Sequence, residues 1–150
     1  MNLPEPQSVT FPSLFDQIRN GTIKIPQFQR DFVWTKGMSA RLLDSIIKGY
    51  PIGTFILWST QERLRSIRNL GGTDLPDTPA GNAVKYVLDG QQRLTSLFVT
   101  LNGLTVRREE HEDDYSQMWL DLKATEEDEL VLLDVRGREE GDFIKLHELL

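Results

Sequence analysis

Cysteine is absent from the 150 residues of the sequence. This absence excludes a disulfide scaffold, a zinc–thiolate site and a cysteine nucleophile, and it is compatible with a reducing cytoplasm. A folded chain of this length buries about 70% of the surface that its unfolded form exposes, so it needs neither a disulfide nor a structural metal for stability. We therefore expect a single domain over residues 1–150.

Long hydrophobic runs are also absent from the sequence. The longest apolar runs cover residues 55–58 and 130–133, far short of the roughly 20 residues that span a bilayer. The amino terminus has neither the basic start nor the apolar run of a secretory signal. These absences predict a cytoplasmic chain with no membrane partner.

Positive charge is in the minority, with 17 Lys and Arg against 23 Asp and Glu and a net charge of -6. The excess of acid is confined to the last third of the chain. Residues 1–100 carry 11 basic and 8 acidic side chains, whereas residues 101–150 carry 6 and 15. The second part would repel a long polyanion unless the two faces point apart, which argues mildly against a stand-alone DNA-binding protein. We expect the functional surface in the first part.

Apolar residues recur at helical spacing in three segments. Residues 14–20 follow Ser13, a predicted N-cap. Residues 36–48 follow Thr35, and residues 91–102 end before a glycine. The spacing predicts one amphipathic helix in each segment.

Short apolar runs between turn residues indicate strands at several places. Strands are predicted over residues 22–25, 54–59, 84–88, 117–122 and 130–135. We expect the strand over 54–59 to be buried. Residues 62–70 read as a further strand or hairpin arm, and residues 71–82 as an exposed loop. The alternation predicts an α+β (mixed α/β) domain with a small mixed sheet and flanking helices.

The last residues, 143–150, read as an apolar helix that has only begun. A stretch with so much apolar side chain and no cap favours a chain that is the amino-terminal fragment of a longer protein. A terminal helix docked on the domain itself is the alternative.

Arginine, amide and acidic side chains concentrate in two segments, IPQFQRDFVW (residues 25–34) and LDGQQRLTS (residues 88–96). A phosphate site needs such groups: guanidinium groups that bind oxygens, N–H groups at a helix start, and a carboxylate that can hold a divalent cation. Asp89 lies where the predicted strand becomes the helix, and Gly90 lets the backbone come close to a ligand. The two segments therefore predict an anion site.

A purely structural interpretation of the same residues stays open. Asp89 can cap the helix, and Arg93 can pair with Asp89 or Asp31 to bind strand to helix. Phe28 and Trp34 can stack on a base or fill the core, and we favour the core.

Three motifs in order carry a resemblance to a known family. They are IPQFQR (residues 25–30) with Trp34, LDSIIKGYPIG (residues 43–53) and VLDGQQRL (residues 87–94). Over about residues 9–101 the chain resembles the amino-terminal domain of GmrSD-type modification-dependent restriction endonucleases. The DGQQR pentapeptide is the most specific part of this resemblance.

The resemblance implies a ParB/sulfiredoxin-like nuclease or nucleotidase fold, in which a Gly-x-x-Arg element at a helix start, here residues 90–93, cradles nucleotide phosphates. Asp89 would bind Mg²⁺ or orient the attacking water. Arg93 would contact the phosphates and stabilise charge on the transferred group. The other implied contacts to the nucleotide come from Gln29, Arg30, Gly90, Gln91 and Gln92. The corner at residues 50–53 either lines the cleft or is a plain turn.

The function implied is that of a Mg²⁺-dependent nucleoside triphosphatase that drives or gates restriction of modified phage DNA. The implied partners are a nucleotide, DNA engaged through the full-length protein, and a downstream HNH-type nuclease region or subunit, with a homodimer left open. The sequence has only His111 and His147 and lacks the ligand set of an HNH site, so we expect both to be structural or exposed.

Two other classes of function remain. Arg63, Arg65 and Arg68 alternate along one segment, as in a strand that tracks phosphates, which favours a DNA-binding or nicking ParB-like module without nucleotide turnover. Residues 143–150 instead favour a non-catalytic regulatory domain that binds a partner through its apolar end.

Overall fold

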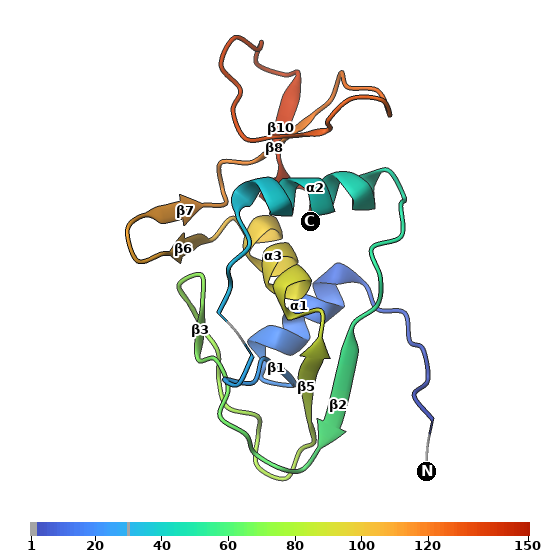
Figure 1. The fold of residues 1–150 in the computed structure, drawn as a ribbon, viewed down its shortest axis with the longest axis vertical. Coiled ribbons are helices and arrows are strands. Elements are labelled where there is room, and N and C mark those ends of the chain that lie inside the picture. Colours follow the sequence, from blue (N-terminus) through green and yellow to red (C-terminus); the bar gives the residue numbers. More distant parts are fainter. Residues whose placement is uncertain (1–2, 30) are drawn as a thin grey trace.

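The computed structural model describes residues 3–29 and 31–150 of the chain. In chain order, the described elements are α1 (Phe11–Arg19), β1 (Ile23–Lys24), α2 (Lys36–Ile47), β2 (Ile56–Thr60), β3 (Asn69–Leu70), β4 (Thr73–Asp74), β5 (Val84–Asp89), α3 (Gln91–Leu101), β6 (Thr105–Arg107), β7 (Glu112–Asp114), β8 (Trp119–Asp121), β9 (Val131–Leu132), β10 (Phe143–Lys145) and the 3-10 helix η1 (Leu146–Glu148). Helices and short strands alternate as predicted (Figure 1), which confirms the mixed α+β class.

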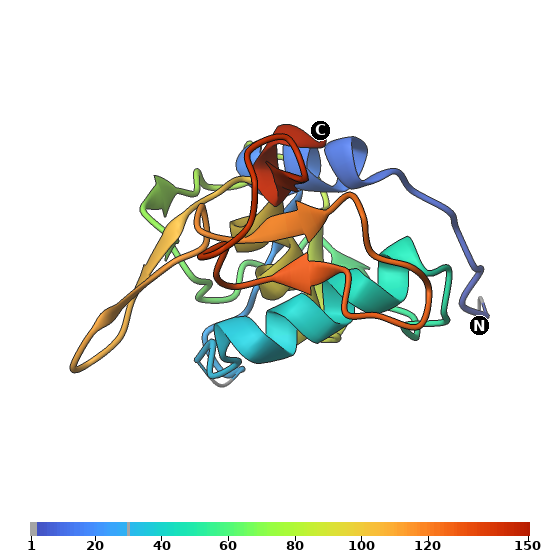
Figure 2. The ribbon, with the colours of Figure 1, turned by 90° about the horizontal axis from the view of Figure 1, so that it is seen from above.

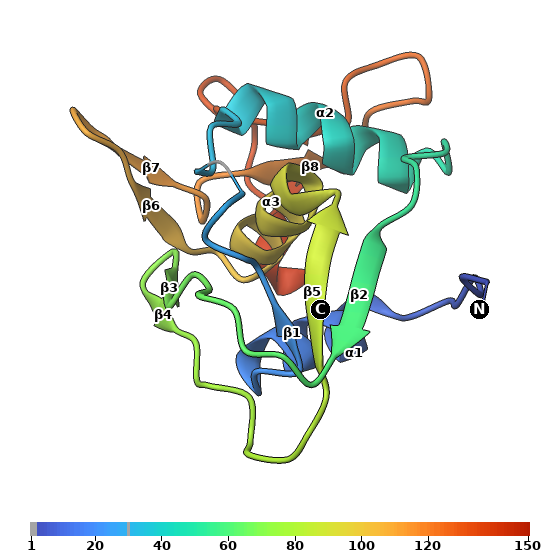
Figure 3. The ribbon, with the colours of Figure 1, turned by 60° about the horizontal axis from the view of Figure 1, so that its bottom comes forward.

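The central sheet has three strands in the order β1-β5-β2. The middle strand, β5, runs parallel to β1 and antiparallel to β2, so the sheet is mixed, as predicted. Figure 3 shows α3 leaving the end of β5 and turning back behind the sheet. The strand that was expected to be buried, β2, is instead an exposed edge strand, because β5 covers only one of its sides.

Helix α3 lies at the centre of the core. Ten of its eleven residues are buried, and the exception is Arg93. The predicted amphipathic pattern is therefore incomplete, since polar positions of α3 are also enclosed. One of them, Ser96, shares a hydrogen bond of 2.6 Å with Ser39 on α2. Helices α1 and α2, the sheet and η1 surround α3 and contribute the rest of the core.

The first two helices start at threonine caps. Thr35 accepts a hydrogen bond from the Met38 amide and caps α2, as predicted. In α1 the cap is Thr10, which accepts from the amide of Ser13, so the helix begins three residues before the predicted start. Ser13 was a wrong prediction because it lies within the first turn. No helix in the described part of the chain is long and apolar enough to cross a membrane.

Part of the acidic last third forms a small sheet that lies against α2. Strands β8, β9 and β10 make an antiparallel sheet (Figure 2). Asp44 of α2 accepts a hydrogen bond of 2.6 Å from the Leu130 amide, and Lys48 donates to the Asp128 carbonyl at 2.7 Å. The predicted helix over 143–150 is wrong. Residues Phe143–Lys145 pair with β8 as strand β10, and a single 3-10 turn follows.

The region between β2 and β5 also differs from its prediction. Residues 62–70 hold only the two-residue strand β3 and an isolated bridge from Ser66 to Pro26. Residues 71–82 are not simply an exposed loop, because β4 pairs with β3 and the side chains of Leu75 and Thr78 are buried. This region thus packs on the sheet as part of the domain.

The first prediction concerns the central helix. Leu97 of α3 is fully buried, whereas Leu122 is 56% exposed. Leu97→Ala should lower the free energy of unfolding by about 2–5 kcal/mol because it leaves a cavity in the core. Urea denaturation of the variant and of the matched control Leu122→Ala measures the difference. Equal losses in the two variants would contradict the central position of α3.

Candidate functional site

The junction between β5 and α3 carries the DGQQR motif, with Asp89 ending the strand and Gln91 beginning the helix. Gly90 between them has φ of +91°. A Cβ atom at Gly90 would lie 2.4 Å from Cδ1 of Phe55 and 3.1 Å from Nη2 of Arg93. Glycine is required here both by the backbone conformation and by the close approach of these side chains.

The guanidinium of Arg93 is enclosed by the corner that precedes β2. Nη1 donates to the Ile52 carbonyl at 2.6 Å, and Nη2 donates to the Thr54 carbonyl at 2.9 Å. The group also lies over the Phe55 ring, 5.0 Å from its centroid. A Cβ at Gly53 would lie 2.7 Å from Nη1, so the corner can close on Arg93 only with glycine at that position. The corner therefore binds Arg93, while its place in the wall of a nucleotide cleft stays a prediction.

Asp89 is the exposed member of the motif. Its side chain is 66% exposed, and one carboxylate oxygen lies 4.0 Å from Nη2 of Arg93. The interpretation of Asp89 as the helix cap is wrong, because Gly90 occupies the N-cap position and no described side chain caps α3. The pairing of Arg93 with Asp89 is present at the outer limit of an ion pair, while the backbone carbonyls are its nearer partners. The Asp89 carboxylate thus faces solvent beside the start of α3.

Gln92 of α3 binds the backbone of residues 31–34, which follow the IPQFQR motif. Its Oε1 accepts from the amides of Val33 at 2.9 Å and Trp34 at 3.4 Å, and its Nε2 donates to the Asp31 carbonyl at 2.8 Å. Nε2 also lies 3.4 Å from Oε1 of Gln91. Both glutamines are buried. The bonds of Gln92 join two segments that lie about 60 residues apart in sequence, while contact of either glutamine with a nucleotide stays a prediction.

Gln29 lies against the end of β5. Its Nε2 donates to the Leu88 carbonyl at 3.3 Å and to the Val87 carbonyl at 3.5 Å, which brings the first motif to the edge where Asp89 lies. Arg30, the other predicted anion contact of this motif, lies outside the described residues. Phe28 is 68% exposed, so its predicted place in the core is wrong, whereas Trp34 packs against the core as predicted.

Arg108 holds the segment of residues 32–34 from the other side, a role that its position in an acidic run does not predict. Nη2 donates to the Trp34 carbonyl at 2.7 Å, and Nη1 donates to the Phe32 carbonyl. Nε forms an ion pair of 2.9 Å with Asp113, and the Tyr115 hydroxyl lies 3.3 Å from Nη2. Burial raises the pKa of Tyr115, so the hydroxyl stays protonated. The first motif is thus clamped between Gln92 and Arg108.

Two cavities lie away from the DGQQR motif. One of about 1220 Å³ separates the first motif from the β3–β4 and β6–β7 hairpins, which project on the same side of the molecule (Figure 3). The second, of about 650 Å³, is lined by basic side chains that include Arg63, Arg65 and Arg68. Residues 89–93 line neither of these two cavities.

The described residues contain no group of three or more His, Asp or Glu side chains placed to hold a metal ion. The side chain of His111 is 63% exposed and lies 3.4 Å from Asp113. His147 is half-buried in η1, packed against Gly103. Both histidines are placed as the sequence predicted.

Comparison with known proteins identifies the class of this α+β domain. The model of the family "GmrSD restriction endonuclease, N-terminal domain" matches residues 11–148, so the chain belongs to this family. The match extends beyond the expected residues 9–101 and includes the acidic last third. No solved structure matches the chain.

Among curated proteins, the chain is similar to an uncharacterised protein of Methanocaldococcus jannaschii. The two are 32% identical over 114 residues, which cover 73% of this chain and 20% of that protein. The chain therefore spans about a fifth of the length of the relative that it matches.

The geometry at Gly90 predicts that a methyl group at this position is costly. Gly90→Ala and Gly137→Ala both place alanine at positive φ, which costs about 1–2 kcal/mol. An added Cβ meets nothing within 4 Å at Gly137, whereas at Gly90 it meets Phe55 and Arg93. Gly90→Ala should therefore reduce stability by about 1–3 kcal/mol more than its control. Thermal and urea unfolding test this difference, and equal costs would show that the junction is loosely packed.

Proposed function

We propose that this domain binds a nucleoside triphosphate together with Mg²⁺ and hydrolyses it, and that the hydrolysis drives or gates the restriction of modified DNA by a longer protein. The observation that carries the proposal is the junction after β5. There an exposed carboxylate, a helix start that no described side chain caps and an oriented guanidinium lie together.

The start of α3 supports phosphate binding. The first N–H groups of a helix have no partner within the helix and carry partial positive charge, which favours an anion there. No described side chain satisfies them by capping α3, and Gly90 leaves the backbone without a Cβ at this point. A phosphate oxygen at the junction would accept hydrogen bonds from this part of the backbone.

Arg93 supplies the positive charge of the proposed site. A guanidinium has five N–H donors, and the hydrogen bonds to Ile52 and Thr54 use one donor on each terminal nitrogen. These bonds fix the plane of the group, so little side-chain entropy would be lost when a phosphate binds. The remaining donors would contact the phosphate and stabilise charge that develops during transfer.

The ligand chemistry of Asp89 fits Mg²⁺ bound jointly with phosphates. Mg²⁺ prefers oxygen ligands and commonly uses one or two carboxylates with phosphate oxygens and waters. Asp89 provides one exposed carboxylate, and the described residues offer no complete protein cage. We therefore expect Mg²⁺ to bind with the nucleotide and not alone. Gln29, Gln91 and Gln92 would shape the wall of the site, and Arg30 would complete it as the sequence predicts.

The proposal predicts a selective loss of activity in Asp89→Asn. This change removes the charge and keeps the shape, so nucleotide hydrolysis should fall by about 100-fold or more, and Mg²⁺-dependent binding should weaken. Phosphate release and calorimetry with the four ribonucleoside triphosphates, with and without Mg²⁺, measure both effects. Because the side chain is exposed, the melting temperature should change little.

Asp16→Asn is the matched control, since the Asp16 side chain is 74% exposed and lies on α1. It should retain binding and hydrolysis. A folded chain that binds none of the four nucleotides, with or without Mg²⁺, would sink the proposal and leave the DGQQR motif a structural junction. Equal losses in the two variants would show a general charge effect.

A further inference from the structure

The cavity of about 650 Å³ collects basic side chains that the proposed nucleotide site does not use. It lies beside the first half of β5, away from Asp89. Four of its lining side chains are basic, from Lys24, Arg63, Arg65 and Arg68, and one is acidic, from Asp77. We call these five residues the basic pocket.

The chain segment that carries the three arginines is fixed to the sheet. The Gln27 amide donates to the Arg65 carbonyl at 2.8 Å, and the Leu64 amide donates to the Tyr86 hydroxyl at 2.7 Å. Exposure alternates along this segment: Arg63 and Arg65 are exposed, and Leu64 between them is half-buried. The side chains of Arg63 and Arg65 therefore extend into solvent from a backbone that hydrogen bonds fix to the sheet.

The arginines of the pocket differ in how far they are already engaged. Arg63 donates to the carbonyls of Asn82 at 2.6 Å and Pro79 at 3.3 Å. Arg68 forms an ion pair of 3.6 Å with Asp77, and both side chains are about three-quarters exposed, so the pair contributes little. Arg65 has no hydrogen bond or ion pair to any described side chain or backbone group through its guanidinium. Two arginines are thus available to an anion.

Lys24 lies at the base of the pocket. It is only 5% exposed, and its Nζ donates to the Pro76 carbonyl at 2.6 Å. The pKa of Lys24 is lowered, chiefly because the side chain is buried. The charge of Arg68 adds to this shift, and the carboxylate of Asp77 opposes it. An anion in the pocket would favour the charged form of Lys24.

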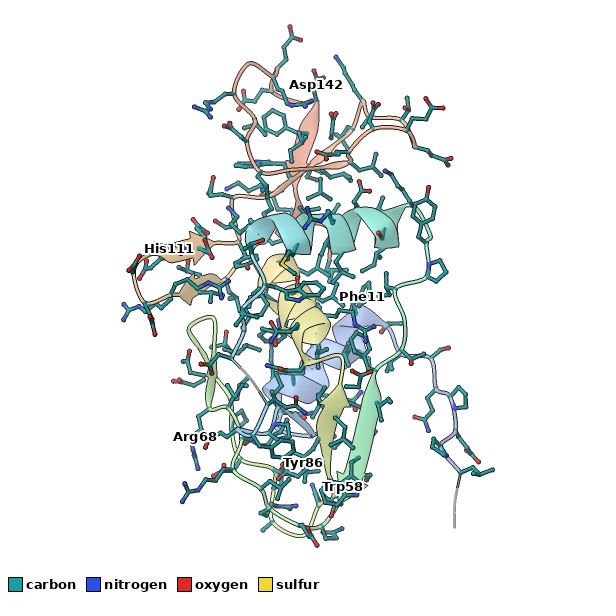
Figure 4. The ribbon with its side chains drawn as sticks, viewed as in Figure 1. Phe11, Trp58, Arg68, Tyr86, His111 and Asp142 are labelled. Atoms are coloured by element: carbon teal, nitrogen blue, oxygen red, sulfur yellow. The ribbon has the colours of Figure 1, made fainter. Side chains whose placement is uncertain are left out.

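The acidic sheet of β8, β9 and β10 lies away from this pocket. Figure 4 places Arg68 and Tyr86 near one end of the long axis and Asp142 near the other, with α2 between them. The repulsion expected from the acidic residues of this sheet therefore acts at a distance, where salt screens it. The sheet therefore points away from the pocket, while the acidic β6–β7 hairpin lies on the same side as the β3–β4 hairpin and borders the larger cavity instead.

We infer that the basic pocket binds backbone phosphates of duplex DNA, chiefly through Arg65 and Arg68, and positions the duplex without reading its base sequence. Guanidinium contacts to phosphates supply affinity and register and carry no direct sequence information. Several cations spread over an open surface suit a strand with many phosphates better than one small anion. The site is separate from the proposed nucleotide site and does not depend on it.

The test is fluorescence anisotropy of short labelled duplexes with the intact chain, in EDTA and without nucleotide. Arg65→Ala combined with Arg68→Ala should weaken binding about equally for duplexes of different sequence, by about tenfold or more at low salt. The slope of log affinity against log salt should fall by about two, one for each lost phosphate contact. Arg65→Ala alone should lower it by about one.

The matched control combines Arg41→Ala with Arg136→Ala, which makes the same change in net charge at exposed positions on α2 and after β9. It should keep the slope of the unchanged chain. Equal weakening by both double variants, absence of binding to any duplex, or full competition by millimolar inorganic phosphate would overturn the inference. Asp89→Asn should bind DNA as the unchanged chain does, so failure here is distinct from failure of the nucleotide proposal.

Discussion

The burial of α3 is the constraint on which the rest of the structure depends. Most of the larger polar side chains of this enclosed helix are held by partners from neighbouring segments, because an unpaired polar group in a core is costly, although the Oγ1 atoms of Thr95 and Thr100 have no hydrogen-bond partner among the described residues. Gln92 therefore forms hydrogen bonds with the backbone of residues 31–34, and Arg93 donates to the carbonyls of the corner at residues 52–54. Ser96 forms a hydrogen bond with Ser39 of α2. The three motifs of the family are joined through one helix.

This arrangement divides the DGQQR motif into parts with different roles. Gly90 permits close packing, Gln92 and Arg93 assemble the neighbouring segments, and Asp89 is left exposed beside the helix start. Removal of Arg93 would loosen the corner and also remove charge, so its loss cannot separate folding from phosphate binding. Asp89 is the position at which the two can be separated. Arg93 thus has two roles in this account: it holds the corner in place, and in the proposed function it also contacts the phosphate.

The distribution of charge gives the domain two ends. The acidic residues of the last third belong to the β6–β7 hairpin and to the small sheet over α2, and the arginines of the basic pocket lie beside the central sheet. Since the family match includes both parts, the acidic layer is a component of the domain and not an appended tail. A net charge of -6 therefore describes neither surface. Local charge, and not the total, governs what each end can bind.

The sequence by itself determined the features that local rules control: α2 with its Thr35 cap, the strand β5, the glycine at the junction and the family motifs. Only the tertiary structure decided which partners these segments meet. Residues 143–145 are apolar enough for a helix, yet they form a strand because β8 offers backbone hydrogen bonds. No local pattern around Arg108 indicates a partner, yet this side chain binds a segment 74 residues away in sequence. Spacing along the chain encodes local geometry, whereas hydrogen-bond partners and burial depend on contacts between distant segments, which periodicity does not contain.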